Sequence, residues 1–332
     1  MKRIGLVLLC FLFLCAPMFG CAAKEKSLRD VTLNEVTRSV FYAPLYVAVS
    51  KGFFSAEGLD VTIVTSGGSD KSMTALLSGE AEIALMGPET AVYVKNEGKE
   101  AYPRIVAQLT KRDGSFLLGR KAEADFSWSS LKGKSVIGGR PGGMPYMTLL
   151  YILKNHGLEP GKDVDVISNI QFPLMGGAFD SGTGDYVTLF EPTASVFQAS
   201  GKGHIVANVG LESGEVPYTA FMVKENTLHE DAAFVDAFVR AIYKAQCWTW
   251  EAADEEIAQA MLPFFPDTDV ETLSMVAKSY RETDSWTKTP VMNEEAFTRL
   301  QDVIENAGEL KARIPFEELV DNSFGEKAVK GK

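Results

Sequence analysis

Hydrophobic and polar residues alternate along the chain with two periodicities. A period of two residues predicts short strands, and a period of about 3.6 residues predicts amphipathic helices. Residues 31–36 alternate with the period of a half-buried strand, and residues 44–50 form a predicted helix that starts with a proline and stops at Gly52. The same order continues, with strands at 60–64 and 82–86 and helices at 69–77 and 88–96. Such alternation favours parallel sheets with right-handed crossovers.

A displacement of 103 positions superposes several landmarks of the first half on similar residues of the second. The matched pairs are Lys51 with Lys154, Gly58 with Gly161, Asp60-Val61 with Asp163-Val164, Ser78-Gly79 with Ser181-Gly182, and Glu82 with Asp185. Internal similarity of this kind predicts two lobes built on one plan.

Beyond Asp231 the pattern becomes mainly helical. Apolar residues recur at helical spacing over four segments, which are 232–253, 255–261, 270–283 and 294–307. We expect these helices to pack onto one lobe. The closing residues 326–332 are polar and without periodicity, which predicts a frayed tail.

A hinge is expected between the two lobes. Residues 115–119 and 217–223 are short apolar runs on either side of the second half, and we interpret them as two crossovers. Lobe 1 then comprises residues 31–112 plus 218–325, and lobe 2 comprises residues 113–217. The expected fold class is therefore α/β, with two lobes, a hinge and a ligand cleft between them.

The first residues resemble an export signal. Basic residues at 2–3 precede an apolar run over 4–19, and Gly20-Cys21 follows. The run is too short for a typical spanning helix, so residues 1–20 predict a signal peptide of the lipoprotein type and residues 21–30 a tether. We expect Cys21 to carry the lipid and the protein to lie on the outer face of the cytoplasmic membrane; plain cleavage after Ala22 or Ala23, which leaves it in the periplasm, is the alternative.

Composition and charge narrow the function classes. With 33 basic and 44 acidic residues the formal charge is −11, which works against a nucleic-acid partner. Two of the four cysteines fall inside the leader, so only Cys21 and Cys247 survive export and no disulfide framework is expected. The three histidines, His156, His204 and His229, have no metal-ligand spacing, and we expect neither a metal nor another cofactor.

Several ordered motifs between residues 31 and 223 resemble one family of binding proteins. They are the segments at 41–48 (FYAPLYVA), 51–54 (KGFF), 57–61 (EGLDV), 75–83 (ALLSGEAEI), 131–134 (LKGK), 191–192 (EP) and 216–219 (VPYT). These are similar to the NMT1/THI5-like and SsuA-like binding proteins. The resemblance implies a type II periplasmic-binding-protein fold, a small-molecule ligand, and an ABC permease with its ATPase as partners.

Candidate ligand contacts lie where glycine-rich turns follow the strands, because open α/β sheets bind small molecules beyond the carboxyl ends of their strands. The candidates are Arg38, Phe41, Tyr42, Gly68, Ser69, Gly87, Arg140, Gly142, Gly143, Glu191 and Tyr218. Each also has a plainer explanation. The loop at 139–143 fits a solvated turn, Tyr42 fits a core residue, and Glu191 fits the favourable first turn of a helix.

Two ligand classes remain open from these residues. Phe41, Tyr42 and Glu191 favour a small nitrogen heterocycle of the hydroxymethylpyrimidine type, although Tyr42 stands where thiamine-precursor relatives often have histidine. Arg38 and Arg140 suit a sulfonate, taurine, nitrate or a carboxylate instead. An enzyme like the yeast pyrimidine synthases of this fold is the least favoured alternative, because the histidine and the cysteine-rich segment that they use are missing.

Overall fold

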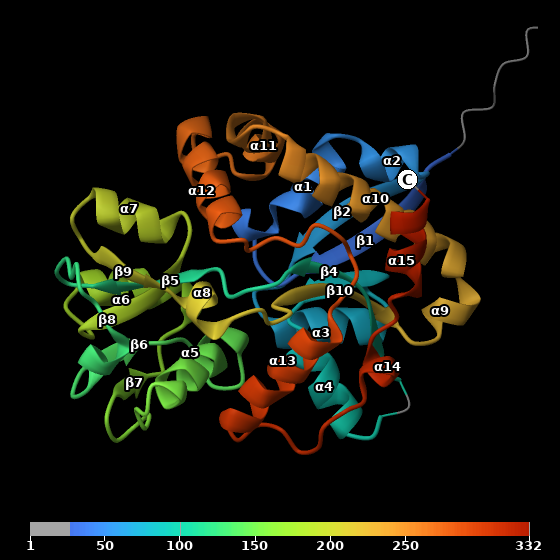
Figure 1. The fold of residues 1–332 in the computed structure, drawn as a ribbon. Coiled ribbons are helices and arrows are strands. Elements are labelled where there is room, and N and C mark those ends of the chain that lie inside the picture. Colours follow the sequence, from blue (N-terminus) through green and yellow to red (C-terminus); the bar gives the residue numbers. More distant parts are fainter. Residues whose placement is uncertain (1–26, 100, 332) are drawn as a thin grey trace, which may run out of the picture.

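Two five-stranded sheets organise the chain into two lobes (Figure 1). The computed structural model describes residues 27–99 and 101–331. The predicted leader, Cys21 and most of the predicted tether lie outside the described residues. Within the described ranges, no helix combines the length and the apolar character needed to cross a bilayer.

The sheet of lobe 1 has the order β2-β1-β3-β10-β4. Its strands are β1 (Arg29–Glu35), β2 (Leu59–Thr65), β3 (Ile83–Met86), β4 (Pro103–Thr110) and β10 (Thr219–Lys224). Strand β1 runs parallel to β2 and β3, whereas β10 runs antiparallel to β3 and β4. The expected all-parallel sheet is therefore wrong at β10, which enters lobe 1 from lobe 2 and so runs against its neighbours.

The sheet of lobe 2 repeats this plan with the order β7-β6-β8-β5-β9. Its strands are β5 (Ser115–Gly119), β6 (Ser135–Ile137), β7 (Asp165–Ile167), β8 (Tyr186–Phe190) and β9 (His204–Asn208). The antiparallel strand is now β5, which enters lobe 2 from lobe 1. The offset of 103 positions carries Ile83, the start of β3, onto Tyr186, the start of β8, so the predicted internal repeat is present in the fold.

Helices cover both sheets (Figure 1). The four helices of lobe 2 are α5 (Met144–Asn155), α6 (Met175–Asp180), α7 (Thr193–Ala199) and α8 (Val209–Ser213). The early helices of lobe 1 are α1 (Ala43–Ser50), α2 (Phe53–Ala56), α3 (Ser69–Ser78) and α4 (Glu89–Asn96). The later ones are α9 (Thr227–Glu230), α10 (Ala232–Glu251), α11 (Asp254–Met261), α12 (Val270–Glu282), α13 (Glu294–Asn306), α14 (Phe316–Leu319) and α15 (Ser323–Lys330). Four 3₁₀ turns complete the described elements: η1 (Val40–Tyr42), η2 (Trp128–Leu131), η3 (Phe172–Leu174) and η4 (Leu262–Phe264).

The apolar runs at 115–119 and 217–223 are not the crossovers themselves, as the sequence had suggested. Residues 115–119 form strand β5 and residues 219–223 lie in strand β10, and each of these strands pairs with a neighbour on both sides. The chain crosses between the lobes at 111–114 and 214–218. These segments lie side by side, since the Val216 N–H donates to the Lys111 carbonyl at 3.0 Å and the Tyr218 N–H donates to the Thr110 carbonyl at 3.1 Å.

Two expectations about the C-terminal helices are also wrong. The expected frayed tail at 326–332 falls largely within α15, which packs against α10 and β4. Its apolar face is short, with Gly325 and Ala328 buried and Phe324 and Val329 partly buried against the core, so the polar residues around it hid the periodicity. The C-terminal helices do not pack on one lobe only, because α13 contacts α4 of lobe 1 and α5 of lobe 2.

Candidate ligand-binding site between the lobes

An aromatic cluster lies where the two lobes meet, with the Phe41 ring at its centre. The Phe41 centroid is 5.0 Å from that of Tyr280 and 5.9 Å from that of Tyr218, both in lobe 1, and 5.8 Å from that of Phe190 in lobe 2. The Trp286 indole N–H fixes the Phe41 backbone by donating to its carbonyl at 2.9 Å. Aromatic rings contributed by both lobes therefore pack against one another at this junction, two of the pairs edge to face.

A group of polar side chains, the polar layer of Tyr42, Glu89 and Tyr218, adjoins this cluster because of the strand register. In the antiparallel pairing of β3 and β10, Met86 lies opposite Ala220, so the end of β3 lies beside the start of β10. The turn after β3 carries Gly87 and Glu89, and the residue before β10 is Tyr218. Tyr42 is buried nearby: burial raises the pKa of its hydroxyl, and the charges of Glu35 and Glu89 raise it further.

Glu89 is the least expected member of the layer. Its side chain is 2% exposed, and its Oε2 atom has no hydrogen-bond partner among the described residues. The carboxyl group lies back over Gly87, where an added Cβ would be 2.0 Å from Oε2. Burial raises the pKa of Glu89 to about 8, opposed by the hydrogen bond of its own backbone N–H.

Asp113 adds a second buried carboxyl group from the first crossover. One oxygen accepts from the Ser115 backbone N–H at 2.7 Å and from the Ser115 hydroxyl at 2.5 Å, while Oδ2 has no partner. Burial raises the pKa of Asp113 to about 6. The Tyr218 hydroxyl is the neighbour of Asp113: burial raises the pKa of Tyr218, and the charge of Asp113 and a hydrogen bond toward it raise that pKa further, although the geometry is looser than that of a well-formed hydrogen bond.

Glu35 shows what a fully satisfied buried carboxylate looks like in this protein. It accepts from the Tyr46 hydroxyl, the Thr65 hydroxyl and the Arg38 Nε–H, each at 2.7 Å. The Arg38 guanidinium also lies over the rings of Tyr46 and Phe264. Arg38 is therefore already engaged by a structural carboxylate.

Glu191 connects lobe 2 to α12. Its carboxylate accepts from the Ser195 backbone N–H at 3.0 Å, from the Ser195 hydroxyl at 2.8 Å and from the Ser279 hydroxyl at 3.2 Å. The Glu191 backbone N–H donates to the Tyr280 hydroxyl oxygen at 3.2 Å. Both carboxylate oxygens are thus used within the protein, and contact of Glu191 with a ligand stays a prediction.

The remaining predicted residues lie around this centre. Gly68 caps α3 and Ser69 is its first residue, at the carboxyl end of β2. Gly143 caps α5, and the Gly142 carbonyl accepts from the Tyr93 hydroxyl of α4 at 3.2 Å, which joins the two lobes. Arg140 is exposed. The glycine loop of lobe 2 therefore lies at the junction, while Arg140 faces solvent.

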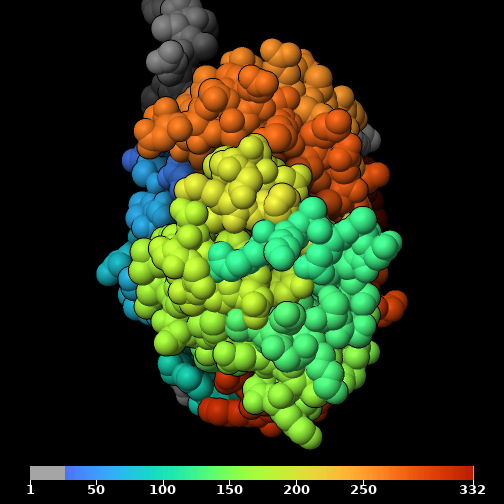
Figure 2. Space-filling model, turned by 90° about the vertical axis from the view of Figure 1, so that its left-hand side faces the viewer, coloured from blue at the N-terminus to red at the C-terminus, as the bar shows by residue number. Residues whose placement is uncertain are grey.

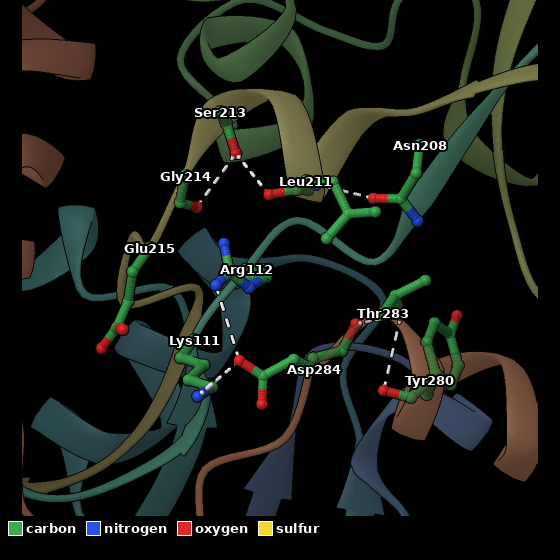
Figure 3. Close-up of polar contacts among 12 residues, drawn as sticks. Lys111, Arg112, Asn208, Leu211, Ser213, Gly214, Glu215, Tyr280, Thr283 and Asp284 are labelled. Atoms are coloured by element: carbon green, nitrogen blue, oxygen red, sulfur yellow. Dashed lines mark hydrogen bonds and ion pairs between the residues drawn. The ribbon is translucent and has the colours of Figure 1, made fainter.

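The hinge is braced by a loop of lobe 1 (Figure 3). Asp284, which follows α12, receives Lys111 at 2.8 Å and Arg112 at 3.5 Å on one carboxylate oxygen. Its φ of 52° places a non-glycine residue in the left-handed region. The ion pairs explain why an aspartate stands where a helix end ordinarily favours glycine.

The two lobes are in contact in this structure. The Lys154 ammonium of α5 donates to the Asn306 carbonyl at 2.6 Å, in addition to the contacts of Glu191 and Gly142. Figure 2 looks onto lobe 2, with orange residues of the C-terminal helical region along its upper edge. Phe41 and Glu89 are both buried in this arrangement of the lobes.

Glu89 and Asp113 were not among the residues predicted from the sequence. The signal for Glu89 was an acidic residue directly after Gly87-Pro88 at a strand end, but a first-turn glutamate has a sufficient local explanation in the helix dipole. Asp113 follows two basic residues, and nothing in that local sequence distinguishes it from an ordinary surface aspartate.

The two-lobed fold is shared with solved structures of solute-binding proteins. The chain belongs to the NMT1/THI5-like family, whose model matches residues 40–256. It is 44% identical to YtlA of Bacillus subtilis (strain 168), described provisionally as a binding protein, over 99% of this chain and 98% of that protein.

Two further similarities are more distant. The formylaminopyrimidine-binding protein of Halalkalibacterium halodurans (strain ATCC BAA-125 / DSM 18197 / FERM 7344 / JCM 9153 / C-125) is 24% identical, over 89% of this chain and 98% of that protein. The alkanesulfonate-binding protein SsuA from Xanthomonas axonopodis pv. citri, bound to MOPS, superposes with a TM-score of 0.70 at 15% identity, over 88% of this chain and 98% of that one. The expected fold and family are confirmed.

Proposed function

We propose that the protein captures a small nitrogen heterocycle that carries N–H donors, of the hydroxymethylpyrimidine type, and presents it to an ABC permease and its ATPase. The observation that carries this proposal is the lining of the lobe junction, where aromatic rings adjoin buried carboxyl groups with unpaired oxygens. Phe41, Phe190 and Tyr218 offer faces for a planar ring. Glu89 and Asp113 offer acceptors for its N–H groups.

A sulfonate, nitrate or carboxylate ligand would need a site lined by positively charged or N–H donor groups in place of carboxyl groups. Such anions bind to cationic or N–H donors. An anion placed beside buried carboxyl groups would lose its hydration without gaining a donor, which is unfavourable. Arg38 is held by Glu35, and Arg140 is exposed. The two arginines on which the anion alternative depends are therefore not placed to bind an anionic ligand at the lobe junction.

The named ligand of one relative supports the same chemistry. The formylaminopyrimidine-binding protein takes a substituted aminopyrimidine by its name, and the similarity spans most of both chains. We further propose that Cys21 is acylated and tethers the protein outside the cytoplasmic membrane, which supports repeated delivery to a membrane-bound permease. This part rests on the leader alone.

Calorimetry on the mature protein tests the ligand class. The probes are 4-amino-5-hydroxymethyl-2-methylpyrimidine, ethanesulfonate and nitrate. We expect the pyrimidine to bind and Tyr42→Ala to weaken it by about 1 kcal/mol, the worth of one aromatic contact. The matched change Arg140→Ala, at an exposed side chain, is expected to have little effect.

The anion alternative predicts the reverse pattern. If ethanesulfonate or nitrate binds, Arg38→Ala and Arg140→Ala abolish that binding, and Tyr42→Ala is silent, the heterocycle proposal is wrong. Arg38→Ala needs a stability control, because it also removes a partner of Glu35.

A further inference from the structure

Resting on the proposed function, we infer that the Glu89 carboxyl group, in its neutral form, is the anchor for the ligand's amino-substituted ring edge. Its carbonyl oxygen accepts from the exocyclic amino group, and its O–H donates to the adjacent ring nitrogen. Glu89 is thereby a specificity-determining residue of the site.

The geometry leaves one oxygen of this carboxyl group without a partner, although the backbone N–H of Glu89 itself bonds to the group. Glu89 is the first residue of α4, at the carboxyl end of β3, and its carboxyl group is close enough to Tyr42 and Tyr218 to contribute to raising the pKa of both hydroxyls. Its Oε2 atom is buried without a partner, although leaving a buried polar atom unpaired costs about 1–3 kcal/mol. Glu35, buried in the same lobe, has three partners and no such vacancy.

Burial, with no cation among the groups that act on it, favours the neutral form of this carboxyl group. The titratable groups that face it are three phenols, Tyr42 before α1, Tyr93 on α4 and Tyr218 before β10. Asp113 acts on Tyr218 and Glu309 acts on Tyr93, so the acidic groups nearby do not favour ionisation either. The raised pKa of Glu89, about 8, agrees with this environment.

A neutral carboxyl group matches an aminopyrimidine atom for atom. It has one O–H donor beside one carbonyl acceptor. A 4-aminopyrimidine presents a ring-nitrogen acceptor beside an amino donor, so the two groups form a pair of parallel hydrogen bonds without proton transfer. Sulfonate and nitrate offer acceptors alone and cannot complete the pair.

Three variants separate this pairing from other roles of Glu89. A glutamine keeps a donor beside an acceptor and cannot ionise, an alanine has neither, and Glu97→Gln changes an exposed glutamate at the other end of the same helix. The probe is 4-amino-5-hydroxymethyl-2-methylpyrimidine, titrated calorimetrically into the mature protein at pH 7 and pH 9. The Glu89→Gln titration also corrects for any ionisation of the probe itself.

The pairing predicts four results. Glu89→Ala weakens binding at least tenfold at pH 7, while Glu97→Gln binds as the wild type does. Wild-type affinity falls about tenfold between pH 7 and pH 9, because a carboxyl group with a pKa of about 8 loses most of its neutral form over that interval. Glu89→Gln binds within about threefold of the wild type at pH 7 and does not share that loss.

The contrary outcomes are distinct from a failure of the proposed function. If the wild type binds the pyrimidine and Glu89→Ala binds it equally well, the inference is wrong and the proposed function stands. If Glu89→Gln loses as much as Glu89→Ala, pairing through the neutral form is wrong. If ethanesulfonate binds in place of the pyrimidine, both the proposed function and the inference fail.

Thermal unfolding without ligand decides the case in which neither probe binds. An unpaired buried carboxyl group predicts that Glu89→Gln has a higher midpoint than the wild type at pH 9, and that this difference is much smaller at pH 5. A lower midpoint at both pH values would show that Glu89 is held by a partner within the protein, and would overturn the inference.

Discussion

Replacing Gly210 by alanine should destabilise the hinge, because this residue lies directly against the first crossover. A Cβ added to Gly210 in α8 would be 2.0 Å from the Asp113 carbonyl oxygen and 3.0 Å from its carbonyl carbon. These are backbone atoms, so no side-chain rotation can relieve the overlap. Either α8 or the segment at 111–114 must move.

Overpacking of this kind costs about 1–3 kcal/mol, and we expect the upper part of that range because both sides of the contact are backbone. The matched control is Gly177→Ala in α6, where an added Cβ meets nothing within 4 Å. Alanine there should stabilise the protein by about 0.5–1 kcal/mol through helix propensity. The two changes add the same methyl group to the same lobe and should shift stability in opposite directions.

Urea unfolding of the wild type and both variants measures the difference, and calorimetry with the aminopyrimidine measures its effect on the site. Because Asp113 lies in the displaced segment and reaches the polar layer, Gly210→Ala should also weaken ligand binding. If Gly210→Ala unfolds at the wild-type urea concentration, the tight approach of α8 to the crossover is refuted, and with it the hinge described here.

Three further changes test separate parts of the molecule. Cys21→Ser should move the protein from the membrane fraction to the soluble or secreted one, because a chain end without acyl groups has almost no bilayer affinity; an unchanged distribution between fractions contradicts acylation. Asp284→Ala should lower stability more than Asp284→Gly, by about 1 kcal/mol, since both lose the ion pairs but only alanine retains the cost of a positive φ; equal unfolding midpoints would remove the strain argument. The Glu89 pKa is raised from 4.5 to about 8 on folding, so the folded state holds an extra proton between these pH values. The free energy of unfolding should therefore fall as pH rises from 4.5 to about 8. Urea titrations of Glu89→Gln should not show this loss.

Most of the fold could be predicted from the pattern of strands and helices along the sequence. Apolar periodicity predicted α10, α12 and α13, and the offset of 103 positions predicted that the two sheets share one plan. The sequence pattern did not predict the direction of β5 and β10, because a strand has the same period of two whether its neighbours run parallel or antiparallel. Direction is decided by where the chain crosses between lobes, which is a tertiary property.

The site was predictable only in outline. Phe41, Tyr42, Gly87 and Tyr218 do gather at the lobe junction, because all follow or precede strand ends on one edge of the sheet. Whether a charged side chain is available to a ligand depends on its partners, which composition and spacing do not reveal. Arg38 is occupied by a glutamate three residues earlier, whereas Glu89 has an unpaired oxygen.

The central claim is that a small molecule is enclosed between two lobes that must part to admit it. X-ray scattering of the mature protein, free and saturated with 4-amino-5-hydroxymethyl-2-methylpyrimidine, tests this most directly. A ligand that bridges both lobes favours their closed arrangement by its differential affinity. We therefore predict a smaller radius of gyration for the saturated protein, and saturation without any compaction would contradict the account.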